Sequence, residues 1–308
     1  MLRAVLFSAI ATAGLVACGA VITISVPGVG GSRSFPAGYE RFASPDAHAF
    51  RFSADGEPVR RGKFSERFEL RDRDCGGNDC GKPWYRTEIG QTQEVVRASL
   101  GSDIWYGWSF YNENVASVSS QSTLGAVFGQ WKLESDLPSI FRITQAPLGD
   151  GGWQTCDPAI CDRSGDATMD VVVSLEDMRS ANNWGPKQNS GSVCRLFSMA
   201  QNRGKWVDLV LNTNFSPDAN GFLRIWVNGA LRCNYSGPLV SVTSALKSNK
   251  DPNQRRGIFA ARAEAWERAN AGATKPTMVI YYDEFLDGER REDVDTFFRE
   301  ANGLKPKD

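Results

Sequence analysis

The stretch KWVDLVLNTNFSPDANGFLRIWVNGALRCNYSG, residues 205–237, decides the fold of this chain. Val207, Leu209, Leu211 and Phe215 alternate with Asp208, Asn212 and Asn214, which is the period-two pattern of a half-buried strand. A second alternating run follows over residues 223–228, and Asn228-Gly229 is a dipeptide preferred at the corner of a type I′ hairpin. The stretch therefore predicts an antiparallel meander within a larger sheet.

Short strand-like runs separated by turn residues continue along most of the chain. They cover residues 49–52, 65–70, 104–111, 126–133, 140–144, 169–174 and 278–285. Many short strands with Gly, Pro, Asn and Asp between them predict an all-β sandwich or jelly roll. Residues 104–111 are aromatic on both faces, which predicts a central strand buried on both sides.

The C-terminal region differs from the rest in its hydrophobic spacing. Val294, Phe297, Phe298 and Ala301 lie at helical spacing before a glycine, so we expect one short amphipathic helix that packs on the sandwich. The composition of residues 263–275 fits either a short helix or a loop over a cleft.

The composition limits the domain count and the classes of function. The chain has 308 residues, 41% hydrophobic and 23% charged, and it shows no internal repeat, so we expect one large β domain. A net charge of −1 argues against a general nucleic-acid binder. The chain has a single histidine, His48, which excludes most zinc sites and most Ser-His-Asp schemes.

The N-terminus has the pattern of an export signal. An uncharged run follows Arg3 over residues 4–26, and residues 15–18 have the form of a lipobox that would make Cys18 the lipidated first residue. An uncleaved helical anchor is the alternative, because the apolar run is long enough to span a bilayer. We expect residues 1–31 to be this signal or anchor with a linker, and residues 32–308 to form the jelly-roll domain.

Both interpretations of the N-terminus place the domain outside the cytoplasm, as a secreted, periplasmic or membrane-anchored lipoprotein. We expect a monomer that contacts a membrane only through its N-terminal anchor. The six remaining cysteines support an oxidising compartment. Two C-x4-C pairs and a third pair by elimination predict the disulfides Cys75–Cys80, Cys156–Cys161 and Cys194–Cys233. Metal knuckles are the alternative for the C-x4-C pairs, although their usual spacing is C-x2-C.

Three predicted strands place charged and amide side chains on one face. Residues i and i+2 of a strand share a face, which pairs Arg86 with Glu88 and Gln130 with Lys132, while Arg255 precedes a further strand. Arginine and glutamine neutralise a uronate carboxylate and so acidify the neighbouring carbon, from which a base then removes a proton. The pattern predicts an acidic polysaccharide as partner and β-elimination as the reaction. A cross-strand ion pair on a solvated face is the alternative for Arg86 and Glu88.

The order of short motifs resembles the heparin lyase I-like polysaccharide lyases, which are similar to glucuronan and alginate lyases of jelly-roll fold. The motifs are Arg86-Thr87-Glu88, Trp105 to Phe110, Gln130-Trp131-Lys132, the 205–237 hairpin of concanavalin-like sheets, Gly257-Ile258-Phe259 and Tyr281-Tyr282-Asp283. The resemblance implies a concanavalin-like jelly roll and cleavage of a uronate polymer.

The resemblance also implies roles for individual residues. Gln130, Lys132 and Tyr282 would be catalytic, and Arg86, Glu88, Arg255 and Tyr281 would bind substrate. Tyr281 and Tyr282 point to opposite faces of their strand, so at most one of them lies in the site.

The chain departs from the family pattern at three positions. Lys132 stands where a histidine is typical, Phe259 where a tyrosine is typical, and Arg255 where a lysine is typical. Lysine acts as a base when burial and neighbouring cations depress its pKa.

The departures favour, as an alternative, a non-catalytic carbohydrate-binding protein of the same fold. A retaining glycoside hydrolase would need paired carboxylates in an E-x-D-x-x-E spacing, which the sequence lacks. No cofactor is required for the predicted elimination. Calcium is possible at Asp218, Asn220 and Asp283, although turn and strand-end roles also explain these residues.

Overall fold

The computed structural model describes residues 35–82, 84–120, 122–147, 167–181 and 191–308. The chain divides into two compact units, Met1–Phe35 and Pro36–Asp308, and the second is described below. The predicted boundary at residues 31–32, the lipidation site Cys18 and the Cys156–Cys161 disulfide lie outside the described residues. No helix in the described part of the chain is long and apolar enough to cross a membrane.

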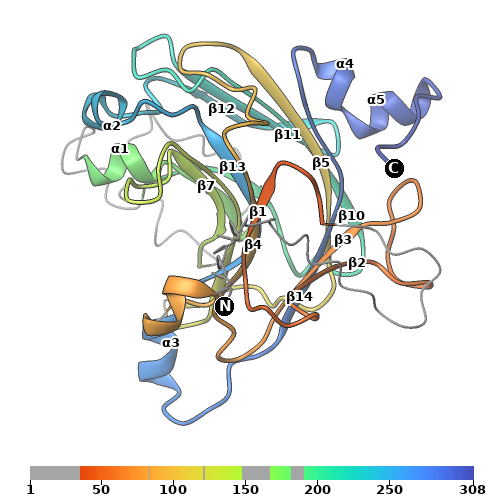
Figure 1. Ribbon diagram of the computed structural model, residues 1–308, viewed down its shortest axis with the longest axis vertical. Coiled ribbons are helices and arrows are strands. Elements are labelled where there is room, and N and C mark those ends of the chain that lie inside the picture. The colour runs from red at the N-terminus through yellow and green to blue at the C-terminus, as the bar shows by residue number, and fades with distance from the viewer. Residues whose placement is uncertain (1–34, 83, 121, 148–166, 182–190) are drawn as a thin grey trace, which may run out of the picture. The chain divides into compact units, whose positions relative to one another are not determined.

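Two seven-stranded antiparallel sheets form a sandwich (Figure 1). Sheet A has the strand order β1 (Tyr39–Phe42), β4 (Arg86–Gln91), β13 (Asn253–Ala261), β6 (Gly125–Lys132), β7 (Phe141–Gln145), β8 (Val171–Ser174) and β9 (Ser192–Phe197). Sheet B has the order β12 (Ala230–Ser236), β11 (Phe222–Val227), β10 (Trp206–Thr213), β5 (Ile104–Asn112), β14 (Met278–Gly288), β3 (Glu66–Leu70) and β2 (Phe50–Phe52). The predicted all-β jelly-roll sandwich is confirmed.

The hairpin at residues 205–237 forms one edge of sheet B. Strand β10 pairs with β11, and β11 pairs with β12. Both corner residues have left-handed backbone, with φ of 49° at Asn228 and 79° at Gly229, as a type I′ turn requires. The apolar residues of β11 alternate inward, and its outward Trp226 stacks on Trp105 of β5 with ring centroids 5.5 Å apart.

Replacing Gly229 with alanine is expected to destabilise the fold by about 1–2 kcal/mol, because an L-residue is strained in this left-handed conformation. A Cβ at Gly229 would meet no atom within 4 Å, so the cost is purely conformational. Urea unfolding measures it. Gly81→Ala, at a glycine without positive φ and with equally open space, is the matched control and should be nearly neutral. Equal stability of the two variants would contradict the turn assignment.

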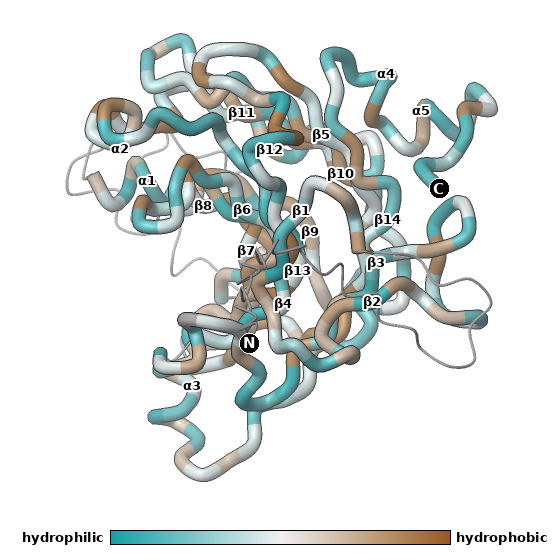
Figure 2. The backbone as a smooth tube through the Cα atoms, in the orientation of Figure 1, coloured by the Kyte–Doolittle hydropathy of each residue, from teal (hydrophilic) through white to brown (hydrophobic). Residues whose placement is uncertain are grey.

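Aromatic rings fill the space between the sheets. Strand β5 is the middle strand of sheet B and is mostly buried, as predicted for residues 104–111. Across the core, Trp131 of sheet A is fully buried and stacks on Phe141 at 4.5 Å. Figure 2 shows hydrophobic residues mainly on the strands, whereas the connecting segments are mostly hydrophilic.

Two of the predicted disulfides are present. Cys194 on β9 bonds to Cys233 on β12, so this bond joins an edge of sheet A to an edge of sheet B. Cys75 bonds to Cys80 and closes a short loop that contains the 3₁₀ helix η1 (Gly77–Gly81) just before β4.

Short α-helices lie between the strands and after the last of them. They are α1 (Glu176–Ser180), α2 (Val242–Lys247), α3 (Ala263–Ala269), α4 (Arg291–Val294) and α5 (Thr296–Ala301). Residues 263–269 are therefore helical, which decides between the two alternatives for that segment.

The single amphipathic helix expected at the C-terminus is divided into α4 and α5. Asp295 has extended backbone and caps α5 by accepting hydrogen bonds from the backbone N–H groups of Phe297 and Phe298. Val294 is buried as expected, whereas Phe297 is 70% exposed, so the break turns part of the apolar stripe away from the sandwich.

Candidate functional site

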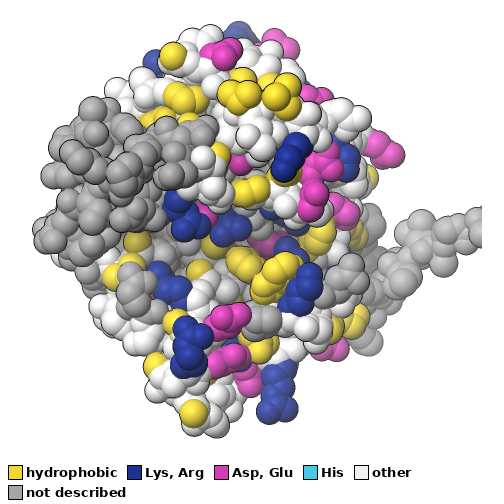
Figure 3. Space-filling view, turned by 90° about the vertical axis from the view of Figure 1, so that its left-hand side faces the viewer, with side chains coloured by type: hydrophobic (Ala, Val, Ile, Leu, Met, Phe, Trp, Pro, Cys, Tyr) yellow, Lys and Arg dark blue, Asp and Glu magenta, His cyan; other side chains and the backbone are white. Residues whose placement is uncertain are grey.

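The outward face of sheet A gathers five of the seven side chains predicted for the site. Strand β4 carries Arg86 and Glu88, β6 carries Gln130 and Lys132, and β13 lies between them and carries Arg255. Arg255 is directly opposite Gln130 in the strand register. Figure 3 shows this side of the sandwich, which is hollowed across its middle, with Lys, Arg and hydrophobic side chains gathered around the hollow.

Hydrogen bonds fix the amide of Gln130 in one orientation. Its Nε2 donates to Glu88 Oε1 at 2.7 Å, and its Oε1 accepts from Ser139 Oγ at 2.8 Å. Ser139 in turn accepts a hydrogen bond from Arg142 Nε at 3.0 Å. Arg142 is on β7, directly opposite Gln130, so the chain of contacts links residues of β4, β6 and β7 and spans β13, which lies between β4 and β6.

Arg86 extends this network to the disulfide loop. Its guanidinium contacts both carboxylate oxygens of Asp79, with Nη2 to Oδ1 at 2.6 Å, and its Nη1 lies 3.6 Å from Glu88 Oε2. Asp79 belongs to η1, inside the loop that Cys75 and Cys80 close. The loop therefore holds Arg86 in place at the end of the face where β4 begins.

Folding changes the basicity of Lys132. Its side chain is 7% exposed, and its Nζ donates to the carbonyl oxygen of Leu137 at 2.6 Å. Burial, together with the positive charges of Arg255 and Arg142, lowers the pKa of Lys132 to about 8, while Glu88 opposes the shift. An amine with this pKa can accept a proton near neutral pH.

Aromatic rings lie among the cations. The Arg255 guanidinium is 3.9 Å from the Phe42 ring centroid, and Phe259 lies 5.7 Å from the guanidinium of Arg86 and 6.0 Å from that of Arg142. Such a surface offers charge to carboxylates and apolar faces to sugar rings.

Two buried atoms of this face, Arg255 Nε and Glu88 Oε2, have no hydrogen-bond partner among the described residues. An unpaired buried polar atom is costly, and a ligand group is one way to satisfy it. The Glu88 side chain itself is fully buried, so its contacts are with Gln130 and Arg86 rather than with the open surface.

The structure does not bring the two predicted tyrosines to the other residues, because β14 belongs to sheet B. Tyr282 points into the core, where its hydroxyl donates to the carbonyl of Phe128 and burial raises its pKa. Tyr281 points to the outer face of sheet B, where its hydroxyl accepts from Arg67 Nε at 3.3 Å. Neither hydroxyl reaches the face that carries Lys132.

Three residues of the network were missed by sequence reasoning. Arg142 alternates with Phe141 and Ile143 in a run already interpreted as a strand, so its outward direction was available from the pattern. Ser139 and Asp79 lie outside strands, and only the fold brings them to Gln130 and Arg86.

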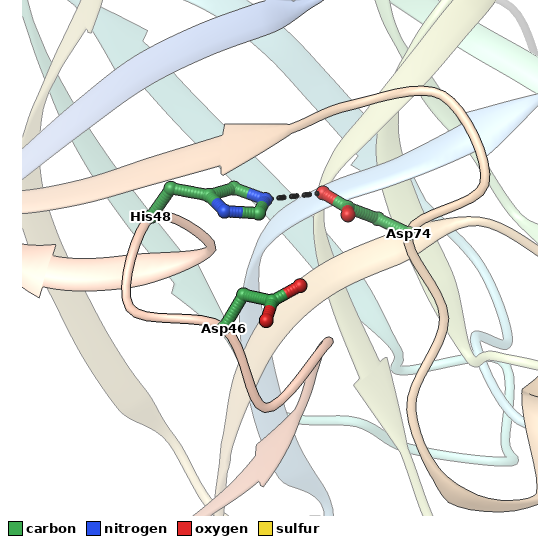
Figure 4. A group of neighbouring side chains, drawn as sticks. All are labelled: Asp46, His48 and Asp74. Carbon is green, nitrogen blue, oxygen red and sulfur yellow. Dashed lines mark hydrogen bonds and ion pairs between the residues drawn. The ribbon is translucent and has the colours of Figure 1, made fainter.

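One cluster in the described part of the chain has the side chains that bind metals. Ligand atoms of Asp46, His48 and Asp74 lie within 4.8 Å of one another (Figure 4). His48 Nε2 is 2.9 Å from Asp74 Oδ2, which also accepts a hydrogen bond from the backbone N–H of Arg71. The first of these bonds joins the two loops that carry His48 and Asp74, whereas Asp46 accepts a hydrogen bond from Ser44 Oγ at 2.8 Å, so hydrogen bonds within the protein give all three side chains a structural role.

The residues named for calcium do not form a comparable cluster. Asp283, on β14 of sheet B, accepts hydrogen bonds from the backbone N–H groups of Arg60 and Arg61 in the segment between β2 and β3. Asn220 lies in the turn before β11 and accepts from Ser216 Oγ. The structural roles expected for strand ends and turns account for both residues.

Comparison of the structure with solved structures returns sugar-polymer enzymes at low identity. An endo-β-1,4-glucuronan lyase from the fungus Trichoderma reesei is 17% identical, with a TM-score of 0.46 over 83% of this chain and 97% of that chain. An alginate lyase of Polysaccharide Lyase family 7 is 9% identical, with a TM-score of 0.47 over 82% and 94%. A GH131 β-glucanase catalytic domain from Podospora anserina is 15% identical, with a TM-score of 0.46 over 83% and 85%.

Comparison of the sequence identifies a family, which the comparison with solved structures does not. The search of curated proteins found no match. The profile of the family described as "Polysaccharide lyase" matches residues 38–286, which include every strand of both sheets except the last two residues of β14. By this match, the chain belongs to the polysaccharide lyase family.

Proposed function

We propose that the chain is an extracytoplasmic polysaccharide lyase that cleaves a uronic-acid-containing polysaccharide by β-elimination. The observation that carries the proposal is Lys132, a buried amine whose pKa is lowered to about 8 and whose charged neighbours include Arg255 and Arg142. The family supports lyase chemistry, and the cations of the site support an anionic sugar as substrate. The grouping with heparin lyase I-like enzymes is part of this proposal.

The geometry supports a reaction that uses one residue for both proton transfers. Arg142, Arg255 and Gln130 hold and neutralise the uronate carboxylate, which acidifies the C5 proton. Neutral Lys132 removes that proton, the electron pair forms the C4=C5 double bond, and the C4–O bond breaks. The Lys132 ammonium then protonates the departing glycosidic oxygen on the same face of the sugar, which restores the free amine.

A carbohydrate-binding protein without activity is the second candidate. It is favoured by Phe259, which has no hydroxyl, and by Tyr282, whose hydroxyl is enclosed in the core. In this alternative the same cations and aromatic rings bind the polymer, and Lys132 serves only as a cation.

Incubation with polyuronates separates the two candidates. The protein is mixed with heparin, heparan sulfate, glucuronan and alginate, and the ultraviolet absorbance of an unsaturated uronate is followed. We expect the absorbance to rise on at least one polymer. Binding to one of them with no rise on any would contradict the lyase proposal and favour the binding protein.

The pH dependence of cleavage should report the protonation of Lys132. Because the neutral amine is the base, kcat/KM is expected to rise with pH through about 8 and then level off. Initial rates in buffers of constant ionic strength measure this profile. A rate that falls as pH rises through this range would show that Lys132 is not the base.

A further inference from the structure

The segment 75–84 is tied to the site but is not explained by the proposed chemistry. The Cys75–Cys80 disulfide closes its first part, and Asp79 within it holds Arg86. The segment then runs through Lys82 and Trp84 into β4. Trp84 lies just before β4, and its exposed ring is beside the site, with its centroid 5.9 Å from the Arg86 guanidinium.

Trp84 differs from the other tryptophans in the described part of the chain. It is 42% exposed, whereas Trp108 and Trp131 are buried in the core and the rest are at least partly covered. Together with Phe42 and Phe259, it is one of three aromatic rings within 6 Å of the Arg86 guanidinium. An exposed indole beside a polar site is a flat apolar surface on which the C–H face of a pyranose ring can stack.

Lys82 adds a charge to this surface. Its ammonium lies 4.3 Å from the centroid of the Trp84 ring, its side chain is exposed, and no carboxylate of the described residues forms an ion pair with it. A stacked uronate would place its carboxylate within reach of a flexible ammonium of this kind, which gives a charge-assisted contact. A neutral sugar would gain only the stacking.

We propose that Trp84 and Lys82 form a binding subsite for a uronate residue of the polymer. The subsite lies where β4 begins, beside the face of sheet A that carries Lys132. The inference rests on the proposed function and adds a specific sugar-binding position to it. It also gives the Cys75–Cys80 loop a role, since the loop fixes Arg86 and the start of the segment that carries the subsite. Trp84 and Lys82 bind substrate away from the proton transfers, so they should affect KM rather than kcat.

Binding is measured by calorimetry in a Lys132→Ala background, which prevents cleavage of the ligand during the titration. The ligand is an oligosaccharide of whichever polyuronate the protein binds, compared with the same oligosaccharide after reduction of its carboxyl groups. Trp84→Ala is expected to weaken binding of the polyuronate about tenfold, and Trp84→Phe by less. Lys82→Gln is expected to weaken binding of the polyuronate but not of the reduced ligand.

Phe297→Ala is the matched control, because Phe297 is an exposed aromatic residue on α5 and should leave the affinity unchanged. In the otherwise unaltered protein, Trp84→Ala should raise KM and leave kcat unchanged. Unchanged affinity in Trp84→Ala, with binding by the parent intact, would overturn the subsite while the lyase proposal stands. Failure of the parent to bind any polyuronate would overturn both.

Discussion

Replacing Lys132 with alanine is expected to reduce turnover of a polyuronate by about 10²–10⁴-fold, the usual contribution of a positioned general base. The reason is the combination of burial and neighbouring arginines that lowers its pKa to about 8. No other described side chain on this face combines a lowered basicity with a position beside Gln130 and Arg255. Initial rates from the absorbance of the unsaturated product measure the loss.

The effect of Lys132 on the stability of the fold provides a control for the loss of activity. A buried amine whose pKa is depressed in the folded state binds fewer protons there than in the unfolded state, so its charge opposes folding at neutral pH. Lys132→Met keeps the side-chain length without the charge, and we expect it to unfold at equal or higher urea concentration while losing activity. A Lys132→Met variant that is stable and fully active would remove Lys132 from the mechanism.

Replacing Arg256 with methionine is expected to destabilise the fold by about 3–5 kcal/mol, because it removes the buried guanidinium that is paired with the buried carboxylate of Glu66. Arg256 is fully buried and contacts Glu66 through two bonds, Nε to Oε2 at 2.6 Å and Nη2 to Oε1 at 2.7 Å. Its guanidinium also lies 4.5 Å from the Tyr39 ring centroid and 4.4 Å from that of Phe285. The pair joins β13 of sheet A to β3 of sheet B.

Urea denaturation of the single and paired variants tests this cost. If the loss comes from the broken ion pair, Arg256→Met combined with Glu66→Leu should recover most of the stability. If the Arg256→Met variant is as stable as the parent, the Arg256–Glu66 pair does not stabilise the packing of the two sheets. Arg255→Met provides a further comparison, because Arg255 is the adjacent residue on the outward face and should affect binding far more than stability.

The contrast between Arg255 and Arg256 shows what alternation predicts and what it does not. Residues i and i+2 share a face, so the pairs Arg86 with Glu88 and Gln130 with Lys132 could be placed together from the sequence. The hairpin corner at Asn228-Gly229 was equally local and was also predictable. A charged residue that points into the core is not predicted by this reasoning, because its partner comes from a distant strand.

The sequence pattern also does not reveal to which of the two sheets a strand belongs. Tyr281 and Tyr282 alternate as expected, but alternation gives only the face of a strand and not the sheet to which the strand belongs. Pairing of β14 with β3 and β5 places both residues away from Lys132. Ser139 and Asp79 were missed for a related reason, since hydrogen bonds from outside the strands depend on loops that only the complete fold positions.

The central claim is that this protein breaks its polymer by elimination rather than by hydrolysis, and product analysis in oxygen-labelled water tests it most directly. Elimination adds no water, so the account predicts fragments without the label and with a C4=C5 double bond in the uronate at each new non-reducing end. The Lys132→Ala variant should leave the polymer intact under the same conditions. Fragments that carry the labelled oxygen and no double bond would contradict the account.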